Sequence, residues 1–134
     1  MAILKGYYNS FYLTVCLEIQ TQIDELSPNE TIINDDYSQH LRWSFGICSS
    51  VNSDAENPVY QYGSIFVERC CLVPGRHTLT CDSSIPTRGW KDARLTIAGH
   101  IYCDNFIGFK LMQNIIVSGI NCIVQIIEYF GSNN

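Results

Sequence analysis

Cysteine is the residue type with the most evident chemistry in this sequence. The chain of 134 residues holds 7 cysteines, and Cys70, Cys71, Cys81 and Cys103 lie close together. Neighbouring residues of a β-strand point to opposite sides, so we expect Cys70 and Cys71 to bond two different partners. Zinc sites bring their ligands in close pairs, whereas the 3 histidines are scattered singly. Disulfide chemistry is therefore favoured over metal binding.

The position of each cysteine relative to the expected strands suggests the pairing. Cys81 and Cys103 end the strand-like segments HTLTC and GHIYC and are our first choice for a disulfide. Cys48 precedes a Ser-rich loop, and we expect it to bond Cys70 or Cys71 across that loop.

The remaining cysteines leave an odd count. They are Cys16, Cys122 and whichever member of the vicinal pair Cys48 does not bond. We expect one thiol to stay free or to bond another chain.

The elements that position the cysteines follow from alternation with a period of two residues, which predicts β-strands. Residues 11–20 alternate apolar and polar side chains, and in residues 40–48 the apolar face includes Trp43 and Ile47. Further strand-like segments span residues 59–73, 76–81, 93–103 and 115–130. Short strands with regular turns and no convincing helix predict a single all-β domain over residues 1–134, an antiparallel β-sandwich of jelly-roll type.

Charge and composition narrow the partners and the compartment. The chain has 8 Lys+Arg against 13 Asp+Glu, a net charge of -5, which offers nothing for a nucleic acid backbone or an anionic membrane. Seven cysteines in a chain with 16% charged residues indicate an oxidising, extracellular environment. No apolar run approaches the roughly 18 residues of a membrane span.

The N-terminal residues fit a secreted chain poorly. The segment MAILKGYYNSFYLTVCLEIQ has no uninterrupted apolar region and no small-residue cleavage site of a signal peptide. Either Met1 replaces a removed leader or the extracellular assignment is wrong.

A resemblance supports the extracellular interpretation. The runs RWSFGICSS, ERCCLVPGRHTLTCDSS, RGW and LTIAGHIYC resemble a cysteine-rich module of secreted marine-invertebrate proteins. In that module CSS is followed by ERCCL.PG.YTLTC.DS.GDGW and a final G..YC. The similarity covers about residues 41 to 106 and implies a disulfide-bonded extracellular β-sandwich. It implies no particular activity.

The module's DS.GDGW loop carries acidic and glycine residues of the kind that surround Ca²⁺. Here the loop reads DSSIPTRGWKD, and Arg88 stands where the second acidic residue would be. A cation would meet this guanidinium, so we expect no cofactor, although Asp82, Ser83 and Asp92 could supply oxygens to Ca²⁺.

The same loop holds the expected ligand site. Trp90 lies beside Arg88 and Lys91, and an aromatic ring with flanking donors can stack on a sugar or anchor a protein contact. The alternative is that Trp90 covers the core. The complete set of expected binding residues is Asp82, Ser83, Arg88, Trp90, Lys91 and Asp92.

We therefore expect a secreted, non-catalytic binding module that recognises a glycan or an extracellular protein through the loops around Trp90 and residues 49–58. The sequence contains no G-x-S-x-G, no H-E-x-x-H and no glycine-rich phosphate loop, so an enzyme is disfavoured. Glu68 and Arg69 are expected to form a surface ion pair. Asn29, in the sequon NET, is an expected glycosylation site.

The alternative function is a self-associating structural or matrix subunit, a homo-oligomer. Residues 115–130 have high β propensity, and Glu128 is their only charge. At a sheet edge such a segment would accept another strand, and Cys122 within it could cross-link neighbours. The competing expectation is that these strands are central and buried on both faces.

Overall fold

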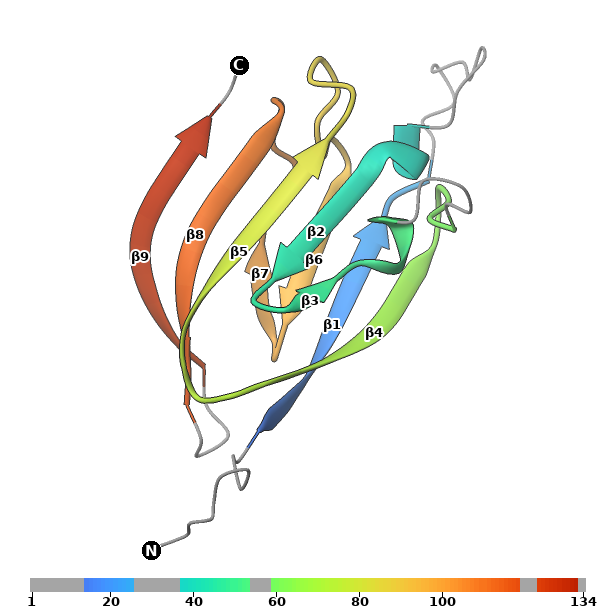
Figure 1. Cartoon of the computed structure of the whole chain (residues 1–134). Coiled ribbons are helices and arrows are strands. Elements are labelled where there is room, and N and C mark those ends of the chain that lie inside the picture. The colour runs from blue at the N-terminus through green and yellow to red at the C-terminus, as the bar shows by residue number, and fades with distance from the viewer. Residues whose placement is uncertain (1–13, 26–36, 54–58, 119–122, 133–134) are drawn as a thin grey trace, which may run out of the picture.

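The computed structural model describes residues 14–25, 37–53, 59–118 and 123–132. Within these residues two antiparallel sheets pack against each other as the two layers of a β-sandwich (Figure 1), which confirms the predicted fold class. The jelly-roll detail stays a prediction. No helix of the described part is long and apolar enough to cross a membrane.

Each sheet contains strands from both halves of the chain. The first sheet has the order β4 (Ile65–Leu72), β1 (Val15–Ile23), β6 (Ala93–Ile97), β7 (His100–Tyr102). The second has the order β3 (Cys48–Ser49), β2 (Leu41–Phe45), β5 (Gly75–Ser83), β8 (Lys110–Val117), β9 (Ile123–Ser132). Two short 3-10 helices, η1 (Tyr37–His40) and η2 (Val51–Ser53), flank β2 and β3.

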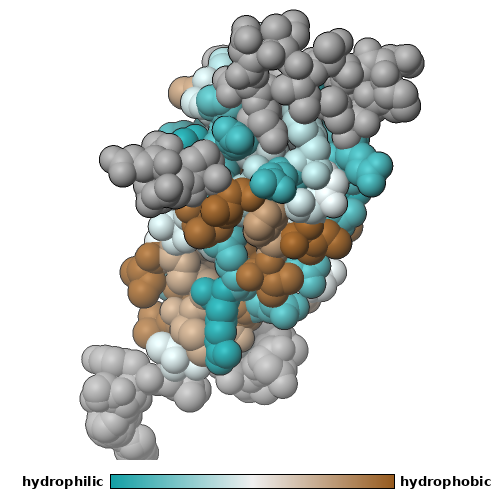
Figure 2. Space-filling model, turned by 90° about the vertical axis from the view of Figure 1, so that its right-hand side faces the viewer, coloured by the Kyte–Doolittle hydropathy of each residue, from teal (hydrophilic) through white to brown (hydrophobic). Residues whose placement is uncertain are grey.

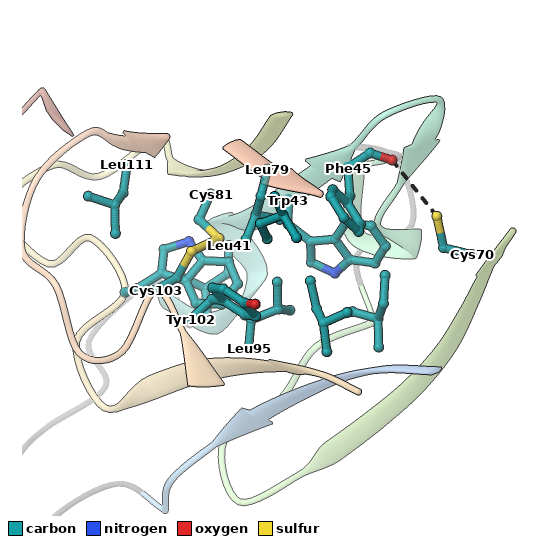
Figure 3. Close-up of a cluster of buried hydrophobic side chains, with 14 of the residues drawn as sticks. Leu41, Trp43, Phe45, Cys70, Leu79, Cys81, Leu95, Tyr102, Cys103 and Leu111 are labelled. Atoms are coloured by element: carbon teal, nitrogen blue, oxygen red, sulfur yellow. Dashed lines mark hydrogen bonds between the residues drawn. A yellow bond between two sulfur atoms is a disulfide. The ribbon is translucent and has the colours of Figure 1, made fainter. Parts of the chain in front are cut away.

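The core lies between the two sheets, because every second residue of a strand points into that space. In β2 the apolar side chains of Leu41, Trp43 and Phe45 are buried, while the residues between them are only half-buried. Figure 3 shows these side chains packed against Leu79 of β5 and Leu95 of β6. Alternating hydrophobicity in the sequence therefore predicts the inner face correctly.

The expected strand over residues 40–48 is interrupted. Gly46 has a φ of 59°, a left-handed conformation that reverses the chain, and Cys48 then pairs with Phe45. A Cβ at Gly46 would lie 2.8 Å from the Leu72 side chain, so that side chain would have to shift to make room for any other residue. Ile47, expected in the core, is 89% exposed because it lies at this turn.

Two other connections define the topology. The segment after β4 carries the chain across the bottom of the sandwich from the first sheet to β5 of the second (Figure 1). The hairpin of β6 and β7 turns at Ala98 and Gly99, both with positive φ. A type I′ turn needs positive φ at both central residues.

Residues 115–130 were expected to lie either at a sheet edge or in its centre, and the two C-terminal strands differ in this respect. β8 pairs with both β5 and β9 and is internal, whereas β9 pairs only with β8 among the described residues. β9 therefore ends the described second sheet. Cys122 and Asn29 lie outside the described residues.

Candidate functional site

Three disulfides join the described strands. They are Cys16–Cys71, Cys48–Cys70 and Cys81–Cys103. The second and third agree with the expected pairs, and the vicinal cysteines bond different partners as predicted. In the first bond, Cys16 pairs with Cys71, the vicinal cysteine that Cys48 does not bond.

These bonds differ in location. Cys48–Cys70 connects β3 of the second sheet to β4 of the first, and Cys81–Cys103 connects β5 to the residue after β7. Figure 3 shows Cys81–Cys103 among the buried side chains. Both bonds thus tie the two sheets together. Cys16–Cys71 lies within the first sheet, because these two residues face each other in β1 and β4.

Trp90 does not form part of a surface site. Its side chain is 0% exposed, its ring stacks on Phe106 with centroids 6.3 Å apart, and its Nε1 donates to the Asp82 carbonyl at 2.9 Å. The expectation that Trp90 contacts a ligand is wrong, and its alternative, a core role, is confirmed. Burial of a large ring with its N–H satisfied stabilises the fold.

The other residues near Trp90 are also unsuited to a joint site. Arg88 and Lys91 line a crevice of about 10 Å³, which holds little more than a water molecule. Asp92 adopts a φ of 63°, and its backbone N–H donates to Asn105 Oδ1 at 2.8 Å. The described groups of the loop around Trp90 are therefore used in contacts within the protein, and the loop leaves little space for a ligand.

A second hollow lies on the outer face of the second sheet. Asp82 of β5 lies in register between Arg42 of β2 and Lys110 of β8, so the three side chains share one face. The hollow has a volume of about 230 Å³. Its lining consists of Arg42, Asp82, Ser83, Ser84, Phe109 and Lys110. Asp82 and Ser83 of the expected set lie here, apart from Arg88 and Lys91.

Positive charge exceeds negative charge in this hollow. Burial raises the pKa of Asp82, while Lys110 and Arg42 act in the opposite direction. Two cations against one carboxylate form a locally basic site on a chain with a net charge of -5. Anions are the ligands that such a site attracts.

Phe109 gives the hollow an apolar wall. Its side chain is 48% exposed, and its carbonyl accepts a hydrogen bond from the Ser83 backbone N–H at 3.0 Å. The Ser83 hydroxyl is buried and accepts from the Ile85 N–H at 3.1 Å, so Ser83 shapes the loop and does not present its hydroxyl to a ligand. Trp90 supports the same loop from within through the Asp82 carbonyl.

The opposite wall is held by η1. The Arg42 Nη1 donates to the His40 carbonyl at 3.2 Å, and His40 Nδ1 lies 2.5 Å from the Ser84 hydroxyl. These bonds restrain Arg42 and Ser84 before a ligand arrives. Preorganised side chains lose less entropy on binding.

Arg42, Phe109 and Lys110 were not singled out from the sequence. For Arg42 and Lys110 the signal is the outward position of alternate residues on β2 and β8, and it becomes useful once the strand order is known. Phe109 precedes β8 and carries no such signal.

The described part of the 49–58 loop is fixed by Asn52. Its Nδ2 donates to the carbonyls of Ser38, Gln39 and Leu41 at 3.2, 3.1 and 2.8 Å. Its Oδ1 accepts from the N–H groups of Val59 and Tyr60 at 2.7 and 3.0 Å. Asn52 is fully buried, so residues around it serve the fold. Residues 54–58 lie outside the described part.

Glu68 and Arg69 do not pair, contrary to the expectation. As neighbours on β4 they point to opposite faces, and Glu68 accepts hydrogen bonds from the Tyr60 hydroxyl at 2.5 Å and the Val51 N–H at 2.7 Å. The Tyr60 hydroxyl also accepts from Thr21 and from Trp43 Nε1, each at 3.1 Å. Burial is the main cause that raises the pKa of Tyr60, with the bond to Glu68 adding to it.

The described residues contain no cluster of metal ligands. Across the described ranges no group of at least three His, Cys, Asp or Glu side chains could hold an ion. Asp82, a possible oxygen ligand for Ca²⁺, lies between Arg42 and Lys110, and these two positive charges would repel a calcium ion.

Comparison with known proteins adds no family. No protein-family model matches the chain, no curated protein matches it, and no solved structure matches it. The resemblance to the cysteine-rich module thus stays a prediction.

Proposed function

We propose that the chain is an extracellular binding module whose ligand is an acidic glycan, held in the hollow beside Asp82. The observation that carries the proposal is the exposed ring of Phe109 next to Arg42 and Lys110. An aromatic ring packs against the apolar face of a sugar, and a guanidinium with an ammonium binds a sulfate or carboxylate. The three disulfides of this small domain are typical of extracellular proteins.

Asp82 sets the selectivity in this proposal. Its carboxylate offers an acceptor for sugar hydroxyls and repels a ligand with dense negative charge. Sugars with one acidic group and free hydroxyls therefore fit better than polyphosphates. Since the pKa of Asp82 is raised by burial, acid neutralises this repulsion more readily than at an ordinary aspartate.

A glycan array with neutral, carboxylated and sulfated members tests the proposal, followed by titration calorimetry on the best ligand. We expect acidic members to bind, and Phe109→Ala and Lys110→Ala each to weaken binding by roughly tenfold, as loss of a stacking or charged contact does. Ile107→Ala is the matched control, because Ile107 is exposed nearby but does not line the hollow. An array without acidic ligands, or equal binding by Phe109→Ala and Ile107→Ala, rejects the proposal.

A second function, self-association as a structural subunit, is favoured by the position of β9. This strand ends the described part of the second sheet and pairs there with β8 alone. Its sequence from Ile123 to Ser132 has no Lys or Pro, the residues that block strand addition at an edge. The proposed partner is a second copy of the chain.

Sedimentation velocity of the full chain over a range of concentrations, with and without reductant, tests self-association. A dimer that persists in reductant supports pairing of strands, and one that dissociates points to a disulfide between chains. A monomer at every concentration under both conditions rejects this second function and leaves the glycan proposal untouched.

A further inference from the structure

The outer face of the first sheet carries a disulfide that the glycan site does not use. Cys16 and Cys71 face each other across β1 and β4. Cys16 is exposed and Cys71 is half-buried. Cys70, Cys81 and Cys103 are only 1%, 0% and 4% exposed, so each of the other two disulfides has at least one sulfur in the core.

The exposed disulfide borders a hollow of about 380 Å³ between β1 and β4. The lining residues are Cys16, Leu17, Glu18, Val67, Glu68 and Arg69. Figure 2 looks at the side of the molecule that carries β4 and shows apolar side chains interleaved with hydrophilic ones. The hollow has room for a small molecule beside the Cys16 sulfur.

Charge distinguishes the two sulfurs. Alternate residues of a strand share a face, so Glu18 is the next outward residue after Cys16 on β1, and Arg69 is the outward residue before Cys71 on β4. Glu18 and Arg69 face each other across the two strands, and each lies on the same strand as one of the sulfurs. A guanidinium stabilises a neighbouring thiolate, and a carboxylate destabilises one. When the bond is broken by a nucleophile, negative charge is therefore better placed on Cys71 than on Cys16.

Accessibility and charge thus both favour attack of a thiolate on the Cys16 sulfur, with Cys71 as the leaving group. The more exposed sulfur belongs to Cys16, and the better leaving group belongs to Cys71. Exchange rates depend on which sulfur is attacked, on access and on the stability of the departing thiolate.

We propose that Cys16–Cys71 is a thiol–disulfide exchange site that accepts a low-molecular-weight thiol on Cys16. The thiolate of the small molecule attacks Cys16 Sγ, a mixed disulfide forms, and the Cys16–Cys71 bond breaks to release the Cys71 thiolate. A second thiol of the same class then displaces Cys16 as a thiolate. The pair of protein sulfurs gains two electrons, and the two small thiols become one disulfide.

The fold is expected to survive this exchange. β1 keeps its backbone pairing with β4 from Val15 to Gln22, and Cys70, the neighbour of Cys71, stays bonded to Cys48. Cys81–Cys103 continues to join the sheets. The exchange therefore changes a surface group and leaves the sandwich in place.

Limited reaction of the folded full chain with reduced glutathione tests the site. The reaction is stopped with acid, free thiols are alkylated, and peptides are mapped by mass spectrometry. We expect glutathione on Cys16 and the alkyl group on Cys71, at least roughly tenfold faster than any reaction at the two other bonds, because Cys70, Cys81 and Cys103 are buried and Cys48 is half-buried, whereas Cys16 is exposed. Circular dichroism should be unchanged.

Charge variants separate the proposed site from simple exposure. Arg69→Ala should slow formation of the adduct several-fold, and Glu18→Gln should speed it, while Arg76→Ala on the exposed surface of β5 is the control with no effect. In denaturant the preference for Cys16 should vanish. Initial reaction at a buried disulfide, an adduct mainly on Cys71, or no adduct on the folded chain overturns the proposal.

Discussion

The two faces of β4 differ sharply although they alternate residue by residue. Phe66, Glu68 and Cys70 point inward, where the Glu68 carboxylate accepts from the Tyr60 hydroxyl and the Cys70 sulfur bonds Cys48. Val67 and Arg69 point outward and border an open hollow. The inner residues hold the sandwich together, and the outer ones are accessible to ligands. The hollow at Asp82 repeats this division on the other sheet, where Trp90 lies beneath the loop and Phe109 beside it.

Trp90→Ala and Phe109→Ala give the largest contrast between inside and outside. Removing the buried indole is expected to lower the free energy of unfolding by about 4 kcal/mol, since a cavity replaces a well-packed ring. Removing the exposed phenyl ring should change it by no more than about 0.5 kcal/mol. Urea denaturation measures both. Equal losses in the two variants would contradict the assignment of Phe109 to the surface.

Asn52→Ala tests whether the interior depends on polar groups as well as on apolar packing. We expect the free energy of unfolding to fall by about 3 kcal/mol, because several buried backbone groups lose their hydrogen-bond partner at once. Gln20→Ala on the outer face is the control, because the bond of this side chain to Glu18 is long, at 3.4 Å. A loss at Asn52 as small as that at Gln20 would show that water replaces the amide.

Tyr60→Phe is expected to lower the free energy of unfolding by about 2 kcal/mol. The substitution keeps the ring and leaves Trp43 Nε1 and the Glu68 carboxylate without the hydroxyl. Urea denaturation at neutral pH gives the value.

The same variant has a signature at alkaline pH. The folded pKa of Tyr60 is raised above its unfolded value near 10, so the stability it contributes is present below that value and is lost as the pH rises through the folded pKa. Denaturation from pH 8 to 11 should therefore show a steeper loss for the wild type than for Tyr60→Phe. Parallel curves would mean that the hydroxyl titrates normally.

Asp82→Asn should have the smallest effect on stability, within about 0.5 kcal/mol. The folded pKa of Asp82 is raised, so its contribution is present below the unfolded pKa and is lost as the pH rises through the folded value. The Asn side chain does not titrate, so the variant lacks this dependence of stability on pH. Binding of an acidic glycan should strengthen in acid for the wild type and stay constant for the variant. A pH-independent wild type would argue against Asp82 as the group that tunes the hollow.

The fold class could be predicted because it depends on local alternation. The alternation in β2 predicts that one face of the strand is buried, and that face consists of Leu41, Trp43 and Phe45. The expected bond between Cys81 and Cys103 is also present. The turn at Gly46 could not be predicted in the same way. The alternating pattern continues through Ile47, and both the positive φ of Gly46 and the close approach of Leu72 are properties of the folded chain that the pattern does not contain.

The candidate site was less accessible to prediction for a related reason. An aromatic residue in a polar loop can lie on either side of the surface, so Trp90 and Phe109 could not be told apart from composition. Arg42, Asp82 and Lys110 come together only because β2, β5 and β8 pair in one particular register. Registers between distant strands depend on the whole core and not on any one segment.

The position of β1 has a consequence for biosynthesis. Both of its neighbours come much later in the chain, since Gln22 pairs with Ile65 in β4 and Ile23 pairs with Ala93 in β6. At roughly 5–20 residues per second on the ribosome, β1 waits several seconds with its apolar side chains uncovered. During that interval a nascent chain is exposed to association with other chains. Cys16 emerges well before Cys71, so its thiol must stay available until residue 71 arrives.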